Sequence, residues 1–154
     1  MAGSSGGAIT STLFGSGLFH NKDQGLDVFF NMMQFVYEFL NVIPIPPNVG
    51  MGYFVEKIMD KMLPSNAHVL CTNKVFVHLT KLKGDFNATV ADPNCLKEIE
   101  GNLTASTFKT RKQLIQAMVG TSFVANFSAP DKCGTPYGEN NFVYDGGYSV
   151  ELPW

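Results

Sequence analysis

The sequence has few charges and few cysteines, and both shortages exclude classes of protein. Charged residues make up 16% of the 154 residues and the net charge is −2, which provides no basic surface for nucleic acid. Cys71, Cys95 and Cys133 are far apart and form no Cys-x-x-Cys pair. This spacing argues against a disulfide framework or a zinc site and favours a reducing compartment.

A secretory signal is also not apparent. The residues after Met1 include no basic group, and their apolar side chains are interleaved with Gly, Ser and Thr. We therefore expect an intracellular protein. Three matches to the Asn-x-Ser/Thr glycosylation pattern, at Asn87, Asn102 and Asn126, are accordingly interpreted as chance.

The longest apolar run, residues 28–43, is interrupted by Asn31, Gln34 and Glu38 and is followed by Pro44. It is too short and too polar to cross a bilayer. The pattern favours a buried helix that is apolar over most of its circumference, with a membrane-docking helix as the alternative.

An apolar content of 45% over this length predicts a single domain, residues 1–154. Strands and helices alternate along it, which favours an α/β layer architecture. Residue spacing predicts helices at 5–18, 26–40 and 52–63, and another helix after the N-cap Thr110. Strands are expected at 74–82, 106–108 and 142–145, and residues 85–104 and 128–140 are expected to be rich in loops.

Residues Gly3-Ser4-Ser5-Gly6-Gly7 fit the Gly-x-Ser-x-Gly pattern of a nucleophile elbow. A serine exposed on a sharp strand-to-helix turn needs small neighbours, so a bulky residue at Gly3 or Gly7 is expected to block the turn. The following helix would direct free N–H groups at the reacting centre, and the Gly6 amide is the natural first donor to an oxyanion. The alternative is a flexible Gly/Ser segment.

A nucleophilic serine needs a proton acceptor, and histidine is the usual one. The sequence has three histidines, His20, His68 and His78, and no histidine follows His78. The usual Ser, acid, His order of α/β-hydrolases calls for a late histidine. A Ser-His-Asp triad using His68 or His78 is therefore weakly supported and is kept as an alternative.

Asp145-Gly146-Gly147 offers a different base. A strand that ends on Asp145 presents its carboxylate at an edge of the sheet, where open α/β sheets place their sites. The paired glycines permit a tight turn and the close approach of another backbone. A carboxylate beside Ser5 in a water-poor cleft can accept its proton directly. The alternative is an ordinary Asp-Gly hairpin turn.

Ser5 and Asp145, in this order and with these flanks, resemble the patatin-like phospholipase family, which pairs Gly-x-Ser-x-Gly with Asp-Gly-Gly/Ala. Residues 106–127 are similar to the family's strand, helix and small-residue turn before the aspartate, and Phe142-Val-Tyr-Asp-Gly-Gly resembles the aspartate block itself. Val77-His-Leu-Thr is similar to the central strand of the branch that contains adipose triglyceride lipase and adiponutrin.

The resemblance implies a three-layer α/β/α fold and hydrolysis of acyl esters in phospholipids or acylglycerols. Ser5 would attack the carbonyl, Asp145 would act as the base, and water would release the acyl group. No metal or organic cofactor is implied. The expected partner is a lipid at a membrane or lipid-droplet surface, and the expected location is cytosolic or peripheral at that surface.

The sequence departs from the family pattern at Gly6, where alanine is common, and at Glu151, where asparagine is common. The largest departure lies before Met1. The expected fold lacks the family's first strand, first helix and glycine-rich oxyanion loop, so we interpret the chain as N-terminally truncated. The competing hypothesis is an inactive patatin-like remnant that binds lipid surfaces or a protein partner.

Overall fold

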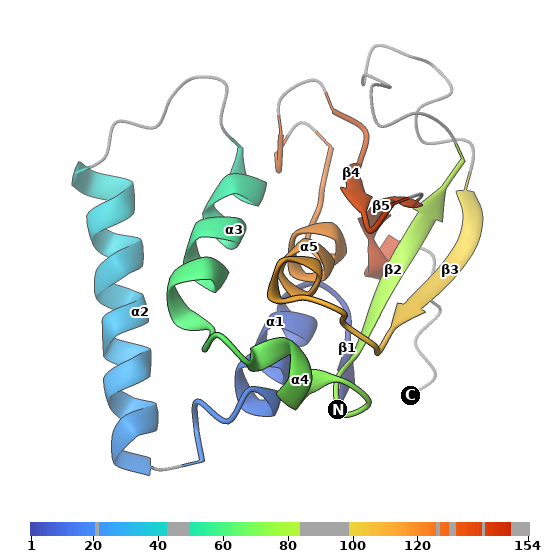
Figure 1. Cartoon of the computed structure of the whole chain (residues 1–154). Coiled ribbons are helices and arrows are strands. Elements are labelled where there is room, and N and C mark those ends of the chain that lie inside the picture. The colour runs from blue at the N-terminus through green and yellow to red at the C-terminus, as the bar shows by residue number, and fades with distance from the viewer. Residues whose placement is uncertain are drawn as a thin grey trace.

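The computed structural model describes residues 1–20, 22–42, 50–83, 99–125, 127–129, 132–139 and 141–148. In these residues the chain forms a mixed α/β structure with an open five-stranded sheet and five α-helices (Figure 1). In chain order the elements are β1 (Ala2–Gly3), α1 (Ser5–Gly15), α2 (Lys22–Val42), α3 (Met51–Met62), α4 (Ala67–Cys71), β2 (Phe76–Leu82), β3 (Ile99–Ala105), α5 (Arg111–Thr121), β4 (Thr135–Tyr137), β5 (Asn141–Asp145) and the 3-10 turn η1 (Gly146–Tyr148).

The sheet is mostly antiparallel and is centred on β2. One edge of β2 pairs with β3 over residues 77–82. The other edge is shared end to end, because β1 pairs in parallel at Phe76 and Val77 and β5 pairs antiparallel from Leu79 onwards. β4 then pairs with the outer edge of β5. The predicted α/β class is confirmed by this arrangement.

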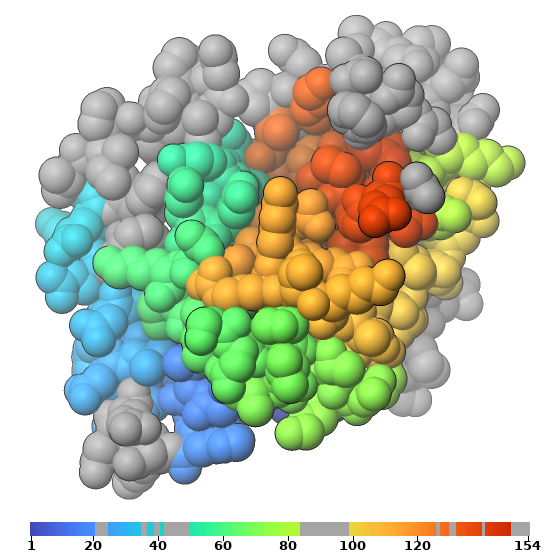
Figure 2. Space-filling model, viewed as in Figure 1, coloured from blue at the N-terminus to red at the C-terminus, as the bar shows by residue number. Residues whose placement is uncertain are grey.

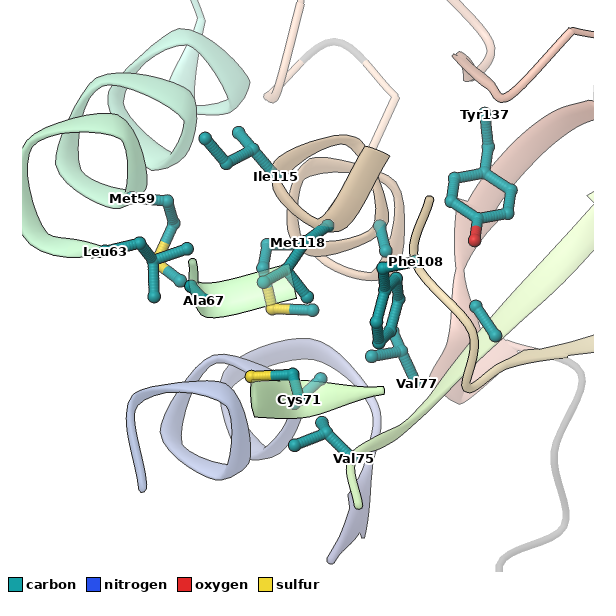
Figure 3. Packing of buried hydrophobic residues seen from close by; sticks show 14 of the residues in the cluster. Met59, Leu63, Ala67, Cys71, Val75, Val77, Phe108, Ile115, Met118 and Tyr137 are labelled. Atoms are coloured by element: carbon teal, nitrogen blue, oxygen red, sulfur yellow. The ribbon is translucent and has the colours of Figure 1, made fainter. Parts of the chain in front are cut away.

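The core lies between the sheet and the helices, which stand on one side of it in Figure 1. Helix α5 is the centre of this layer, since it contacts α1, α3, α4 and the strands β2, β4 and β5. Leu114 and Met118 of α5 are fully buried, and Figure 3 shows Met118 above Cys71 of α4. The Thr12 hydroxyl of α1 donates to Met118 Sδ at 3.1 Å, which links the two helices.

Most of these elements were predicted from local sequence patterns. The four predicted helices correspond to α1, α2, α3 and α5, and the predicted strands at 74–82 and 142–145 correspond to β2 and β5. Thr110 caps α5 as expected, because its hydroxyl accepts the Gln113 N–H at 3.1 Å. Helix α3 ends at Met62, before Pro64, which cannot continue it.

The strand expected at 106–108 is wrong. Strand β3 instead covers residues that were assigned to a loop, and it ends at Ala105. Gly101 and Asn102 lower its intrinsic β-propensity, so pairing with β2 rather than local preference defines it. Residues 85–98, which were also expected to be rich in loops, lie outside the described residues. The expected loop at 128–140 contains the short strand β4.

The prediction of a buried α2 is also wrong. Five of its large apolar side chains form an exposed stripe, with Phe30 65% and Tyr37 67% exposed and Leu26, Phe29 and Met33 also open to solvent. The reason is its position, because among the described elements α2 packs mainly against the outside of α3 and has no strand beside it (Figure 1). Figure 2 shows α2 as the outer surface along one side of the molecule. Among the described helices, none is long and apolar enough to span a membrane.

The cysteines differ from expectation. Cys133 is disulfide-bonded, and Cys71 is a free, fully buried thiol; Cys95 lies outside the described residues. The expectation of no disulfide is therefore wrong at Cys133. Widely separated cysteines in a sequence carry no information on which of them the fold brings together. The reducing compartment that we inferred from the same spacing loses its support.

Cys71 is predicted to be chemically inert in the folded chain. Burial raises the pKa of its thiol to about 11, against a smaller lowering by the Lys74 cation. The thiolate is the reactive form, so at pH 8 its fraction is about a hundredfold below that of a thiol of pKa 9. Iodoacetamide should modify Cys71 in urea and leave it unmodified in buffer, as read by peptide mass spectrometry. Equal modification in both conditions would contradict this assignment.

Candidate functional site

The candidate site lies where two strands meet end to end on β2. Strand β1 runs parallel to β2 and ends at Gly3, which pairs with Val77. Strand β5 runs in the opposite direction and ends at Asp145, which pairs with Leu79. Because both strands occupy the same edge, their carboxyl ends converge on His78. The elbow follows β1 and the Asp-Gly-Gly turn follows β5, so these two segments begin at the same place on the sheet.

The elbow is a sharp turn with an unusual backbone at its serine. Ser5 begins α1 two residues after the end of β1. Its φ is +50°, a left-handed backbone conformation that residues other than glycine rarely adopt. A Cβ at Gly3 would lie 2.6 Å from the backbone carbon of Gly7, so this position requires glycine. The segment is the start of a helix, and the alternative of a flexible Gly/Ser segment does not describe it.

The two following glycines have a different role from the one expected. A Cβ at Gly6 or Gly7 would meet no atom within 4 Å, so the expectation that a side chain at Gly7 blocks the turn is wrong. The Gly7 and Ala8 N–H groups donate to the Ser4 carbonyl. The Gly6 N–H lies in the first turn of α1, where a helix offers no acceptor of its own. Both glycines are exposed, which leaves open space in front of Ser5.

Thr121 holds the elbow against the central strand, a role that the sequence did not reveal. Its hydroxyl accepts the Ser5 N–H at 2.9 Å and donates to the His78 carbonyl at 2.7 Å. The residue is fully buried at the end of α5. The only signal was its place in the small-residue turn Gly120-Thr121-Ser122, which we had related to the family and not to a contact.

Asp145 is fixed from three directions. Its backbone N–H donates to the Phe123 carbonyl at 3.1 Å, and its carbonyl accepts the Thr80 hydroxyl at 2.7 Å. Its side-chain Oδ1 accepts the Gly147 N–H at 2.7 Å. This last bond orients the carboxylate, and the remaining oxygen, Oδ2, is available to another donor. The turn continues as η1, so an ordinary hairpin turn does not describe it.

Both glycines of the Asp-Gly-Gly turn make close approaches. A Cβ at Gly146 would lie 1.9 Å from the His78 carbonyl oxygen, which excludes any other residue there. A Cβ at Gly147 would lie 3.2 Å from Asp145 Oδ1 and 3.7 Å from Ser4 Oγ. The second pair of distances shows that the carboxylate and the elbow border the same small space.

Ser5 and Asp145 lie at the converging ends of β1 and β5 but are not hydrogen-bonded to each other. Both are half-buried, and within the described residues no hydrogen bond joins the Ser5 hydroxyl to the Asp145 carboxylate. Hydrogen bonds between catalytic groups are often long without substrate and tighten when it binds. Proton transfer from the Ser5 hydroxyl to the Asp145 carboxylate therefore requires a side-chain movement that brings the two groups into hydrogen-bonding distance.

The histidines are placed elsewhere. His78 Nδ1 lies 3.0 Å from the Thr104 hydroxyl, and its cross-strand position puts the ring on the face of the sheet that Thr104 shares. His68 belongs to α4, where its Nδ1 is buried without a hydrogen-bond partner among the described residues. His20 is exposed after α1. None of these rings is hydrogen-bonded to Ser5 or to Asp145 in the described part of the chain.

A cavity elsewhere in the structure is separate from the candidate site. A cavity of about 440 Å³ lies between α3, α5 and β4, lined in part by Asp60, Arg111 and Thr135, and neither Ser5 nor Asp145 contributes to it. Asp60 and Arg111 form an ion pair at its rim. Within the described ranges, no three His, Cys, Asp or Glu side chains are grouped so as to bind a metal ion.

Comparison of the chain with protein-family models, with curated proteins and with solved structures gave no match. We therefore infer the function from the geometry of this site and from the residues that build it.

The bridge made by Thr121 gives a first test of the site. Thr121→Val keeps the volume but removes the hydroxyl, so the Ser5 N–H and the His78 carbonyl both lose their partner. We expect a loss of about 1–3 kcal/mol in the free energy of unfolding, because unpaired buried polar groups are costly. Urea unfolding followed by circular dichroism measures it. Thr121→Ser keeps the hydroxyl and serves as the control; a Val variant as stable as the Ser variant would contradict the bridge.

Proposed function

We propose that this chain is a lipid acyl hydrolase of the patatin-like type that uses Ser5 as nucleophile and Asp145 as base. The observation that carries the proposal is the meeting of β1 and β5 at His78, which brings the elbow backbone at Ser5 and the oriented Asp145 carboxylate to the same place on β2. The finer architecture, a three-layer α/β/α patatin-like fold, is part of the same proposal. It is supported by the order and spacing of the two motifs.

In the proposed reaction, Asp145 accepts the proton of the Ser5 hydroxyl as Oγ attacks the ester carbonyl. The carbonyl oxygen gains negative charge, and the Gly6 N–H at the start of α1 donates to it. When the C–O bond to the alcohol breaks, Asp145 returns the proton to the leaving oxygen. Water, deprotonated by the same carboxylate, then cleaves the acyl-enzyme and restores Ser5.

The open space in front of the elbow agrees with this chemistry. Because Gly6 and Gly7 have no side chain in that space, an acyl carbonyl can approach the Ser5 hydroxyl and the Gly6 N–H together. One oxyanion donor contributes a factor of about 10²–10³ in rate. Gly6 is the donor that the described residues supply at the elbow, so we expect slow turnover by this chain and choose a test that needs only one reaction per molecule.

A fluorophosphonate probe tests the nucleophile. The probe phosphonylates activated serines, so it should label the folded chain, and labelling should fall to background in Ser5→Ala. Ser4→Ala is a matched control, because Ser4 is the adjacent, half-buried serine and its helix-starting carbonyl is unchanged by the substitution. Gel fluorescence with circular dichroism of each sample gives the result. A well-folded wild type without label would sink the proposal for this chain.

The same assay assigns the base. Asp145→Asn keeps the shape and the Gly147 contact but cannot accept a proton, so labelling should again fall to background. Asp27→Asn on the exposed side of α2 is the control. If His78→Ala or His68→Ala abolished labelling while Asp145→Asn kept it, a Ser-His-Asp triad would replace the dyad.

A second candidate function is binding to a lipid surface without hydrolysis, and the exposed stripe of α2 favours it. Leu26, Phe29, Phe30, Met33 and Tyr37 recur at helical spacing on one face and are open to solvent. Contiguous exposed apolar surface of this kind is typical of interaction sites. The helix contains one lysine and three acidic residues, so attraction to anionic lipid is not expected to contribute.

Vesicle flotation tests this surface. The double substitution Phe30→Ser and Met33→Ser should lower the partition coefficient on phosphatidylcholine vesicles by about tenfold or more, because apolar burial drives it. Asn31→Ser with Gln34→Ser changes two exposed polar positions of the same helix and should bind as the wild type does. Addition of phosphatidylserine should not increase binding. Equal binding by both double variants would show that α2 is not the contact.

A further inference from the structure

Two observations outside the candidate site concern the same cellular compartment. Cys133 is disulfide-bonded, and disulfides persist in oxidising compartments such as the secretory pathway. The sequence Asn102-Leu-Thr matches the acceptor pattern for N-linked glycans, which are attached in that pathway. The acceptor pattern was interpreted as chance because no secretory signal is apparent after Met1, and the disulfide at Cys133 is an independent indication of the secretory pathway.

The fold presents Asn102 as a usable acceptor. Asn102 lies in the middle of β3 and is exposed, as is its same-face neighbour Thr104. Alternation along the strand turns Leu103 and Ala105 towards the core instead. The other two Asn-x-Ser/Thr matches, at Asn87 and Asn126, lie outside the described residues. Among the described residues, Asn102 is therefore the position that both matches the acceptor pattern and has an exposed side chain.

We propose that Asn102 carries an N-linked glycan. The chemistry is a transfer from a lipid-linked oligosaccharide diphosphate, whose anomeric carbon is attacked by the Asn102 side-chain nitrogen. A C–N bond forms, the C–O bond to the diphosphate breaks, the diphosphate leaves with the electron pair and the nitrogen loses one proton. The hydroxyl of Thr104 is the second element of the acceptor pattern.

Within the described residues, the Asn102 side chain makes no hydrogen bond that a glycan would replace. Asn102 pairs with Thr80 across the sheet, whereas Asp145 pairs with the next residue, Leu79, so the two side chains belong to opposite faces. A glycan on Asn102 thus projects away from the elbow side. In the described residues β3 pairs only with β2, which makes it an edge strand of the described sheet. A hydrated glycan there would hinder edge-to-edge association.

Mass spectrometry of the native protein, isolated from its own cells, tests the proposal. The protein is treated with peptide N-glycosidase in heavy-oxygen water and then with trypsin, which releases the peptide 98–109. We expect most of this peptide to have Asn102 converted to aspartate with one heavy oxygen, and omission of the glycosidase to abolish the conversion. Recovery of the peptide only with unmodified Asn102 would overturn the proposal.

Substitutions expressed in the same cells separate the glycan from an effect on folding. Asn102→Gln leaves the Thr104 to His78 hydrogen bond intact and should remove the glycosidase-sensitive shift on a gel that this site contributes. Thr104→Ala should remove the same shift, and Thr104→Ser, which keeps a hydroxyl, should restore it. A shift that is the same in Asn102→Gln and in the wild type would also overturn the assignment.

Discussion

The backbone of His78 is the point on which the candidate site depends. Its carbonyl accepts the Thr121 hydroxyl, which also accepts the Ser5 N–H, and the same carbonyl leaves no room for a side chain at Gly146. Three segments that are far apart in the chain are thereby held against one peptide group of β2. Because β1 and β5 both end beside this residue, any shift of register along β2 would separate the elbow from the carboxylate.

That register is held by the core. Val77 and Leu79, on either side of His78, are fully buried and point into the helical layer, so a one-residue slip would expose both. Helix α5 covers them with Leu114 and Met118, and the position of its last residue, Thr121, follows from this packing. A substitution in the core can therefore disturb the site without a contact to either Ser5 or Asp145.

Features that depend on neighbouring residues in the sequence were predicted correctly, whereas features that depend on tertiary contacts were not. The cap at Thr110, the stop before Pro64 and the glycine requirement at Gly3 are each set by a few neighbouring residues. Strand β3 and the disulfide at Cys133 depend on pairing across the fold, so composition and spacing gave no correct indication of either. The exposure of α2 was missed because an apolar helix pattern does not tell how much of the helix another element covers.

The backbone at Ser5 separates a structural turn from a functional one. A left-handed conformation costs a residue with a side chain about 1–2 kcal/mol, and glycine adopts it freely. The elbow already uses glycine at three other positions, of which Gly6 and Gly7 have open space where a side chain would fit. Serine thus stands where glycine would be more stable, and glycines stand where side chains would be tolerated. Stability of the turn does not explain this distribution, whereas the proposed nucleophile role, in which the Ser5 hydroxyl must meet a carbonyl in unobstructed space, would explain it.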